Sequence, residues 1–205
     1  MAVGKRWRTT EDGFALAHET ASMPGVLVIY ASTHGQTAKI AGRVARRLRE
    51  GGLSVDLRDI GAAASLSTAD YDGAVIGASV HSGHHQHELV EWTKGHARSL
   101  NGMPSAFLSV SLTAADDTEE SRRATRDYID DFLDDTGWTP GETVSFAGAL
   151  QYREYDFMTR LLMRVLMRRG EYPTDVTHDS DYTEEDSVDS FAHDCEQMLA
   201  DPSRA

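Results

Sequence analysis

The sequence predicts an α/β protein in which a doubly wound parallel β-sheet is covered by helices on both faces. Two observations support this prediction. Short apolar runs rich in β-branched residues, such as Val26–Tyr30 and Ala74–Ala78, have the composition of strands that are buried on both faces. These runs alternate with longer segments of helical spacing, and parallel strands require this alternation because a crossover helix must join each strand to the next.

The composition is that of a globular protein with one core. The chain has 205 residues, of which 40% are hydrophobic and 26% are charged. The formal net charge of −13 argues against nucleic acid as a partner, because the phosphates would be repelled. No apolar run of about 18 residues is present, so no membrane span is expected. The single cysteine, Cys195, fits a reducing compartment, which predicts a cytoplasmic protein, and we expect its side chain to be buried.

Strands and helices are expected to alternate from residue 25 to the end of the chain. The first helix carries apolar residues on one face and arginines on the other, and Gly51 and Gly52 end it. The second strand alternates apolar and polar residues, as an edge strand does. The third strand is a short buried apolar run, Pro104 introduces the fourth, and the fifth follows the turn at residues 137–141. The expected strands are Val26–Tyr30, Leu53–Ile60, Ala74–Ala78, Ser105–Val110 and Thr143–Ala147, and the expected helices are Ala38–Leu48, Glu88–Leu100, Glu119–Asp135 and Glu184–Leu199.

We expect one domain over residues 25–205. Two segments do not fit the alternation of strands and helices: one precedes this domain and one is an insertion in it. Residues 1–24 lack clear periodicity and are expected to form an N-terminal extension, either a flexible tail or a segment with one short helix. Near residues 152–170 a basic amphipathic helix is expected as an insertion. Its arginines, Arg160, Arg164 and Arg168, recur at every fourth residue beside an apolar face. That face is either a contact surface or part of the core, and the pattern leaves both open.

The most informative stretch joins the first strand to the first helix. It consists of Ser32, Thr33, His34, Gly35, Gln36 and Thr37. The amides and partial positive charge of a first helical turn can hold a phosphate without a cation, and the hydroxyl groups of this loop can donate further hydrogen bonds. Gly35 would let the backbone approach a ligand closely. We therefore expect an anion site, and the alternative is a helix N-cap whose hydroxyl groups serve no ligand.

The motifs that this loop lacks restrict the kind of phosphate ligand. No Gly-Lys-Ser/Thr follows it, which argues against an NTPase P-loop. No Gly-x-Gly-x-x-Gly is present either, so the dinucleotide fingerprint is absent. The form Ser/Thr-x-x-Gly-x-Thr between a first strand and a first helix resembles the FMN phosphate loop of flavodoxins.

A second rim loop is expected at Ser79–His87, because ligands of open α/β sheets bind beyond the carboxyl ends of the strands. Its four histidines suggest a metal site, but no carboxylate at helical spacing and no cysteine completes a ligand set, so we expect no metal. We expect His81 and His84 to face a cofactor or substrate and to move protons near neutral pH. His85 and His87 are expected to be surface histidines.

Five stretches occur in an order that is typical of one family. They are Ser32–Thr37, Tyr71–Ser79, Gly83-His84, Met103–Phe107 and Ala147–Tyr152. Together they resemble the flavodoxin-like, menaquinone-dependent protoporphyrinogen IX dehydrogenases of haem synthesis, over about residues 25–200. The basic apolar helix after Tyr152 also resembles an insertion of this family, whereas the pair His81-Ser82 stands where a more basic or aromatic pair is expected.

The resemblance implies a flavodoxin-like five-stranded sheet in the order 2-1-3-4-5 and FMN as the cofactor. It implies oxidation of protoporphyrinogen IX, with menaquinone or another quinone as the electron acceptor. The implied FMN contacts are Ser32, Thr33, His34, Gly35, Gln36 and Thr37 at the phosphate, Ser79, Gly83 and His84 on one side of the ring, and Ser111, Leu112, Thr113 and Ala114 on the other. His81 and His84 are the catalytic candidates.

The arginines of the insertion match the propionates of a tetrapyrrole or the headgroups of an anionic membrane, so peripheral contact with the inner face of the cell membrane is also expected. Two other functions remain open at this point. One is a flavodoxin-type electron carrier that turns over no small molecule and docks to basic partners through an acidic surface. The other is a flavin-free interaction module that keeps only the fold.

Overall fold

A parallel sheet forms the centre of the protein in a computed structural model that describes residues 25–63, 66–148 and 185–200. The strands are β1 (Gly25–Ala31), β2 (Ser54–Asp59), β3 (Gly73–His81), β4 (His84–His85), β5 (Ser105–Ser111) and β6 (Glu142–Ala147). The helices are α1 (Gln36–Glu50), α2 (His87–Leu100), α3 (Glu119–Thr136) and α5 (Glu185–Ala200). Short 3-10 turns lie at Ile60–Ala62, Thr68–Asp70 and Leu112–Ala115. The expected extension 1–24 and the expected insertion near 152–170, with its three arginines, lie outside the described residues.

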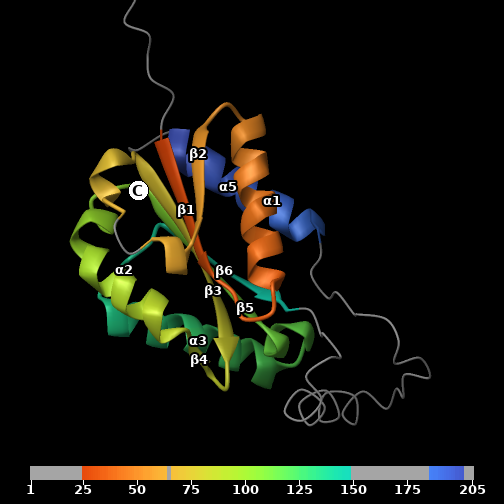
Figure 1. Ribbon diagram of the computed structural model, residues 1–205. Helices are drawn as coiled ribbons and strands as arrows, with labels where there is room; N and C mark the ends of the chain where they lie inside the picture. The colour runs from red at the N-terminus through yellow and green to blue at the C-terminus, as the bar shows by residue number, and fades with distance from the viewer. Residues whose placement is uncertain (1–24, 64–65, 149–184, 201–205) are drawn as a thin grey trace, which may run out of the picture.

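The strand path is β2-β1-β3-β5-β6, and every neighbouring pair along it is parallel. The predicted α/β class is therefore confirmed. Numbered in chain order, the five predicted strands lie along this path in the order 2-1-3-4-5 (Figure 1). One strand was not predicted: β4 pairs antiparallel with the end of β3 and lies off this path.

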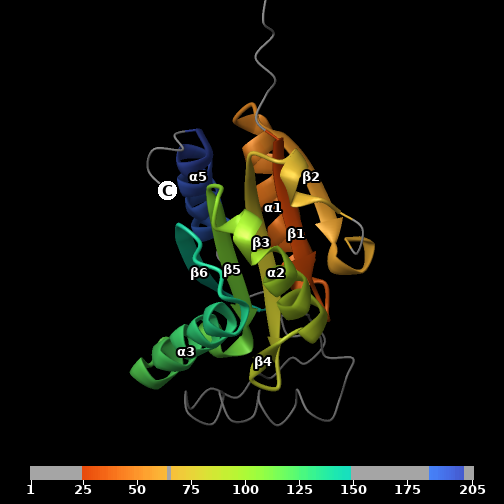
Figure 2. The ribbon, with the colours of Figure 1, turned by 90° about the vertical axis from the view of Figure 1, so that its left-hand side faces the viewer.

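Each face of the sheet has its own core, because successive side chains of a strand point to opposite faces. On β1, Val26 and Val28 pack toward α1 and α5, whereas Leu27 and Ile29 pack toward α2 and α3. All four side chains are fully buried, which explains why this strand is an unbroken apolar run. Figure 2 shows the sheet between these two helical layers. Cys195 on α5 is buried in the first core, as predicted.

Ion pairs join the helices α1 and α5 above the first core. The guanidinium of Arg43 donates to Asp189 at 2.6 and 2.9 Å and to Glu185 at 2.5 Å, and Arg47 also donates to Asp189. Hydrogen bonds from Arg47 and Arg43 hold the pKa of Asp189 well below its usual range. The arginines on the outer face of α1 therefore orient α5 along it rather than serving only as solvated charges.

Most of the segment Ser79–His87 is a β-hairpin and not the loop that we predicted, and its last residue, His87, begins α2. β3 continues to His81, which pairs with His84, and Ser82 and Gly83 form the turn with φ angles of 52° and 88°. Positive φ at both central residues is characteristic of a type I′ turn, whose twist matches that of the flanking strands. The hairpin extends beyond the end of β1 (Figure 2).

His85 is largely buried, so the expectation of a surface histidine at this position is wrong. Its Nε2 lies 3.0 Å from Ser109 Oγ, and its ring packs edge-on against Phe107 and Phe132 at centroid distances of 5.5 and 5.1 Å. The alternation of side chains along β4 explains the difference, because it turns His85 inward while His84 stays exposed. Burial, with a smaller effect of His84, lowers the pKa of His85 to about 4.

We predict that His85 makes the stability of the protein fall in mild acid. Since its pKa is about 4 in the folded protein and 6.5 in the unfolded chain, the unfolded chain binds more protons between these values, and its stability relative to the folded state rises as the pH falls. The contribution of His85 to the free energy of unfolding is complete above pH 6.5 and decreases by up to about 3 kcal/mol toward pH 4.

Urea unfolding of the wild type, His85→Gln and His87→Gln at pH 7 and pH 4.5 tests this prediction. His87 is exposed at the start of α2 and serves as the matched control. The wild type and His87→Gln should lose more stability between the two pH values than His85→Gln does. Equal losses in all three proteins would show that His85 does not cause the acid sensitivity.

Candidate functional site

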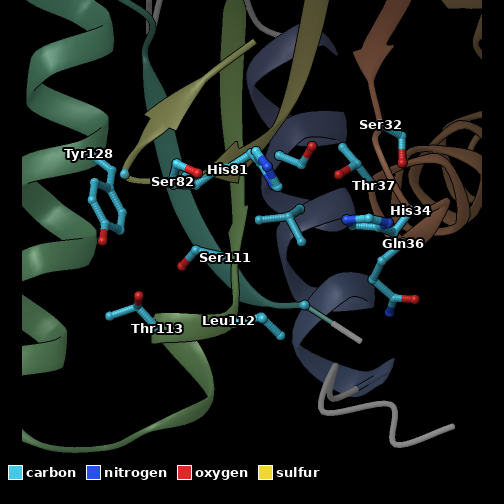
Figure 3. A pocket seen from close by; sticks show the side chains of 15 residues that line it. Ser32, His34, Gln36, Thr37, His81, Ser82, Ser111, Leu112, Thr113 and Tyr128 are labelled. Atoms are coloured by element: carbon cyan, nitrogen blue, oxygen red, sulfur yellow. The ribbon is translucent and has the colours of Figure 1, made fainter. Parts of the chain in front are cut away.

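A cavity of about 310 Å³ lies beyond the carboxyl ends of β1, β3 and β5. This is where open α/β sheets bind their ligands, and the volume is in the range of small-molecule sites. The lining residues come from five segments: Ser32, His34, Gln36 and Thr37; Ser79, Val80, His81, Ser82 and Gly83; Val110, Ser111, Leu112 and Thr113; Tyr128; and Gly148. Figure 3 shows Tyr128 and Thr113 on one side of the cavity and His34, Gln36 and Thr37 on the other.

The first turn of α1 forms one end of this cavity. Its N-cap is Gly35, whose φ of 85° explains the choice of glycine and which has no side chain to cap the turn. The first intrahelical bond runs from the amide of Lys39 to the carbonyl of Gly35 at 3.0 Å, so the preceding amides have no acceptor within the helix. The turn contains no acidic residue. This end of the cavity is therefore suited to an anion.

The hydroxyl of Thr37 provides an independent indication of a ligand. The Thr37 side chain is 1% exposed and lines the cavity, yet its Oγ1 has no hydrogen-bond partner among the described residues. Buried hydroxyl groups are normally satisfied, so a missing partner at a cavity wall needs an explanation. A phosphate oxygen at the N-terminus of α1 would accept this hydrogen bond, and the residues present therefore fit the phosphate of FMN.

Not every residue of the predicted phosphate loop faces the cavity. Ser32 does line it, and its Oγ accepts a hydrogen bond from the Gly35 amide at 2.9 Å. Thr33 instead turns toward β3: its amide donates to Ser79 Oγ at 3.4 Å, and its hydroxyl accepts from Gln86 Nε2 at 3.2 Å. Within the described contacts, Thr33 and Gly35 thus shape the loop rather than line the site.

The opposite walls of the cavity come from the hairpin and from the turn after β5. Ser79, His81 and Gly83 line one wall, together with Ser82. The other wall contains Ser111, Leu112 and Thr113, and Ser111 Oγ accepts from the Ala114 amide at 3.2 Å, which fixes this turn. Ala114 itself does not line the cavity. Of the predicted flavin contacts, Ser79, Gly83 and Ser111–Thr113 thus line the cavity, whereas His84 and Ala114 do not. Their contact with a flavin stays a prediction.

The two catalytic candidates occupy different places. His81 lines the cavity, and its ring lies 6.2 Å from the ring of His34, centroid to centroid. Both residues are exposed, but His84 is not among the lining residues. The sequence analysis missed Tyr128 of α3 and Gln86. Tyr128 lies within the predicted helix Glu119–Asp135, and neither Tyr128 nor Gln86 belongs to a motif.

The charge of the cavity differs from that of the whole chain. No aspartate or glutamate is among its described lining residues, although the net charge of the chain is −13. The polar groups of the walls are hydroxyls, an amide and two imidazoles, so these groups present no negative charge that would repel an anion. Elsewhere in residues 25–63, 66–148 and 185–200, no group of three or more histidine, cysteine or acidic side chains is arranged to hold a metal ion.

No helix in the described ranges combines the length and apolar character that crossing a membrane requires.

Comparison with known proteins shows the family. The chain matches the flavodoxin domain over residues 27–177. The protoporphyrinogen IX dehydrogenase [quinone] of Escherichia coli K12 is 33% identical over 177 residues, which are 86% of this chain and 97% of that protein. The protein of the same name from Leishmania major is 36% identical over 183 residues, which are 88% of this chain and 79% of the relative.

Among solved structures, a flavodoxin of Streptococcus pneumoniae TIGR4 aligns with a TM-score of 0.50. The two share 20% sequence identity, and the alignment covers 86% of this chain and 97% of the flavodoxin. At this identity the likeness supports the fold alone. Family match, relatives and fold agree with the ordered motifs of the sequence: the chain belongs to the flavodoxin-like family of protoporphyrinogen IX dehydrogenases (quinone).

Proposed function

We propose that this protein oxidises protoporphyrinogen IX to protoporphyrin IX, with FMN as its cofactor and menaquinone or another quinone as the electron acceptor. The relatives named above support the reaction. The observation that carries the proposal within the structure is the buried Thr37 hydroxyl, which has no hydrogen-bond partner among the described residues. It lies in the first turn of α1, behind a glycine N-cap, at one end of a cavity. An electron carrier without small-molecule turnover is less well supported, because both relatives are named as enzymes.

The residues of the cavity would divide the work between binding and proton transfer. The first-turn amides of α1 and the Thr37 hydroxyl would bind the phosphate, and Ser111–Thr113 and the hairpin turn would enclose the ring and exclude water. A bound flavin would supply the electron transfer. Both histidines are exposed, but His81 lines the cavity and His84 does not. A ring nitrogen of His81 can accept a proton there, so we assign His81 the role of proton carrier.

The substrate and membrane contacts are proposed for residues outside the described ranges. We assign Arg160, Arg164 and Arg168 to the propionates of the porphyrinogen or to anionic lipid headgroups, because guanidinium groups bind carboxylates and phosphates in pairs of hydrogen bonds. This assignment predicts a cytoplasmic enzyme that can associate peripherally with the inner face of the membrane.

The reaction can be tested directly with the purified protein. We expect the protein to be yellow, to release FMN on denaturation, and to oxidise protoporphyrinogen IX in the presence of a menaquinone analogue under anaerobic conditions. Free FMN at the same concentration is the control for the chemical background. A colourless protein that takes up no FMN, or a rate equal to that of free FMN, would contradict the proposed function.

We predict that Thr37→Val weakens FMN binding about tenfold, because it removes a hydrogen bond to a charged phosphate. Riboflavin, which lacks the phosphate, should bind the variant and the wild type equally. The ligand-free variant should be as stable as the wild type or more stable, since the substitution removes a buried hydroxyl without a partner. Titration of the ligand-free proteins with both flavins measures this, and an equal loss for both would exclude a phosphate contact by Thr37.

The role of the three arginines is tested by replacing Arg160, Arg164 and Arg168 together with glutamine. We expect a higher KM for the porphyrinogen, release of the protein from anionic vesicles, or both. The matched control replaces Arg122, Arg123 and Arg126, three exposed arginines of α3, and so changes the net charge equally. If both triple variants behave alike, the arginines of the insertion act only through net charge.

A further inference from the structure

Gln86 connects three segments at the phosphate end of the cavity without lining the cavity itself. It lies between β4 and α2, and its Nε2 donates to Ser79 Oγ and to Thr33 Oγ1, the latter at 3.2 Å. The amide of Thr33 donates to the same Ser79 hydroxyl at 3.4 Å. One side-chain amide thus joins the loop between β1 and α1, the end of β3 and the start of α2.

Two of these three segments are fixed independently of the network. Ser79 lies in β3, where it is paired with Val110 of β5. The carbonyl of Gln86 accepts hydrogen bonds from the amides of Leu89 and Val90 at 3.1 and 3.2 Å, and Leu89 is fully buried. The backbone of Gln86 is therefore held by the first turn of α2, and its side chain reaches a strand that is held by its pairing with β5. The element whose position depends on the network is the loop that contains Thr33.

The position of this loop decides the geometry of the phosphate end. Thr33 is adjacent in the chain to Ser32 and His34, which both line the cavity, and it precedes the Gly35 N-cap of α1 by two residues. A displacement of Thr33 would also disturb these neighbours, since successive Cα atoms are held about 3.8 Å apart. Binding sites lose affinity when the residues that support their geometry are removed.

We propose that Gln86 is a positioning residue for the phosphate end of the flavin site. It holds Thr33, and with it the loop before α1, against the end of β3, so that the first turn of α1 presents its amides and the Thr37 hydroxyl to the ligand. This inference rests on the proposed flavin function and extends it to a residue that does not touch the flavin. Strand pairing holds the hairpin, Ser79 is fixed in β3, and Ser111 Oγ fixes the turn after β5, so we expect Gln86 to affect the phosphate end much more than the ring walls.

The test uses Gln86→Met, which keeps the approximate volume of the side chain and removes its hydrogen-bond donor. Dissociation constants for FMN and riboflavin are measured on the ligand-free protein by quenching of flavin fluorescence. We expect the FMN constant to rise about fivefold and the riboflavin constant to stay within about twofold of the wild-type value. His87→Met, the same substitution at the next and exposed position, should leave both constants unchanged.

A second variant, Thr33→Val, removes the hydrogen bond between Gln86 Nε2 and Thr33 Oγ1 from the side of the exposed loop. This variant tests the proposal even if Gln86→Met does not fold. It should give the same selective loss of FMN affinity, and the double variant should lose little more than either single one, because both act on one network. An equal loss for both flavins, or an unchanged FMN constant in both single variants, would overturn the positioning role. Failure of the wild type to bind FMN would instead overturn the proposed function, and the inference with it.

Discussion

The amides at the start of α1 need hydrogen-bond acceptors that the helix itself does not supply. In most helices a serine, threonine, asparagine or aspartate at the N-cap accepts one of these bonds. Here the N-cap is Gly35 in a left-handed conformation, which has no side chain to cap the turn. The partial positive charge of the turn lies at the end of a cavity, with no acidic residue in the turn or among the described residues that line the cavity. The site, the proposed cofactor and the role of Gln86 all depend on this arrangement.

The sheet brings the other parts of the site to this helix end. β1 lies beside β3, and β3 lies beside β5, so the segments after these three strands meet at one rim. The apolar run of β1 makes this possible because its alternating side chains anchor the strand in both cores at once. The strand therefore holds the loop that follows it in a fixed position relative to the hairpin and to the turn after β5.

Much of this architecture could be predicted from the sequence, because it depends on local patterns. Strand Val26–Tyr30 and helix Ala38–Leu48 follow from apolar periodicity, and both are present with longer bounds. The hydroxyl-rich loop with Gly35 predicted an anion site, and Ser32, His34, Gln36 and Thr37 do line the cavity.

The errors arise where long-range contacts decide the outcome. The hairpin was mistaken for a loop because its type I′ turn has Ser82 at the first central position, where asparagine, aspartate or glycine is the usual signal. His85 was assigned to the surface because histidine is polar, whereas the aromatic rings of Phe107 and Phe132 and the Ser109 hydroxyl give it a buried place. Gln86 and Tyr128 gave no signal, since neither belongs to a motif. The sheet brings Tyr128 of α3 to the cavity wall and Thr33 within reach of Gln86.

The central claim is that the first turn of α1 holds the phosphate of a flavin. Amide chemical shifts of the isotope-labelled, ligand-free protein, recorded by NMR during titrations with FMN and with riboflavin, test it most directly. The account predicts that FMN alone causes large shifts of the amides of residues 36–38, while both flavins shift residues of the hairpin turn and of Ser111–Thr113. Equal shifts at residues 36–38 with the two flavins, or none with FMN, would contradict it.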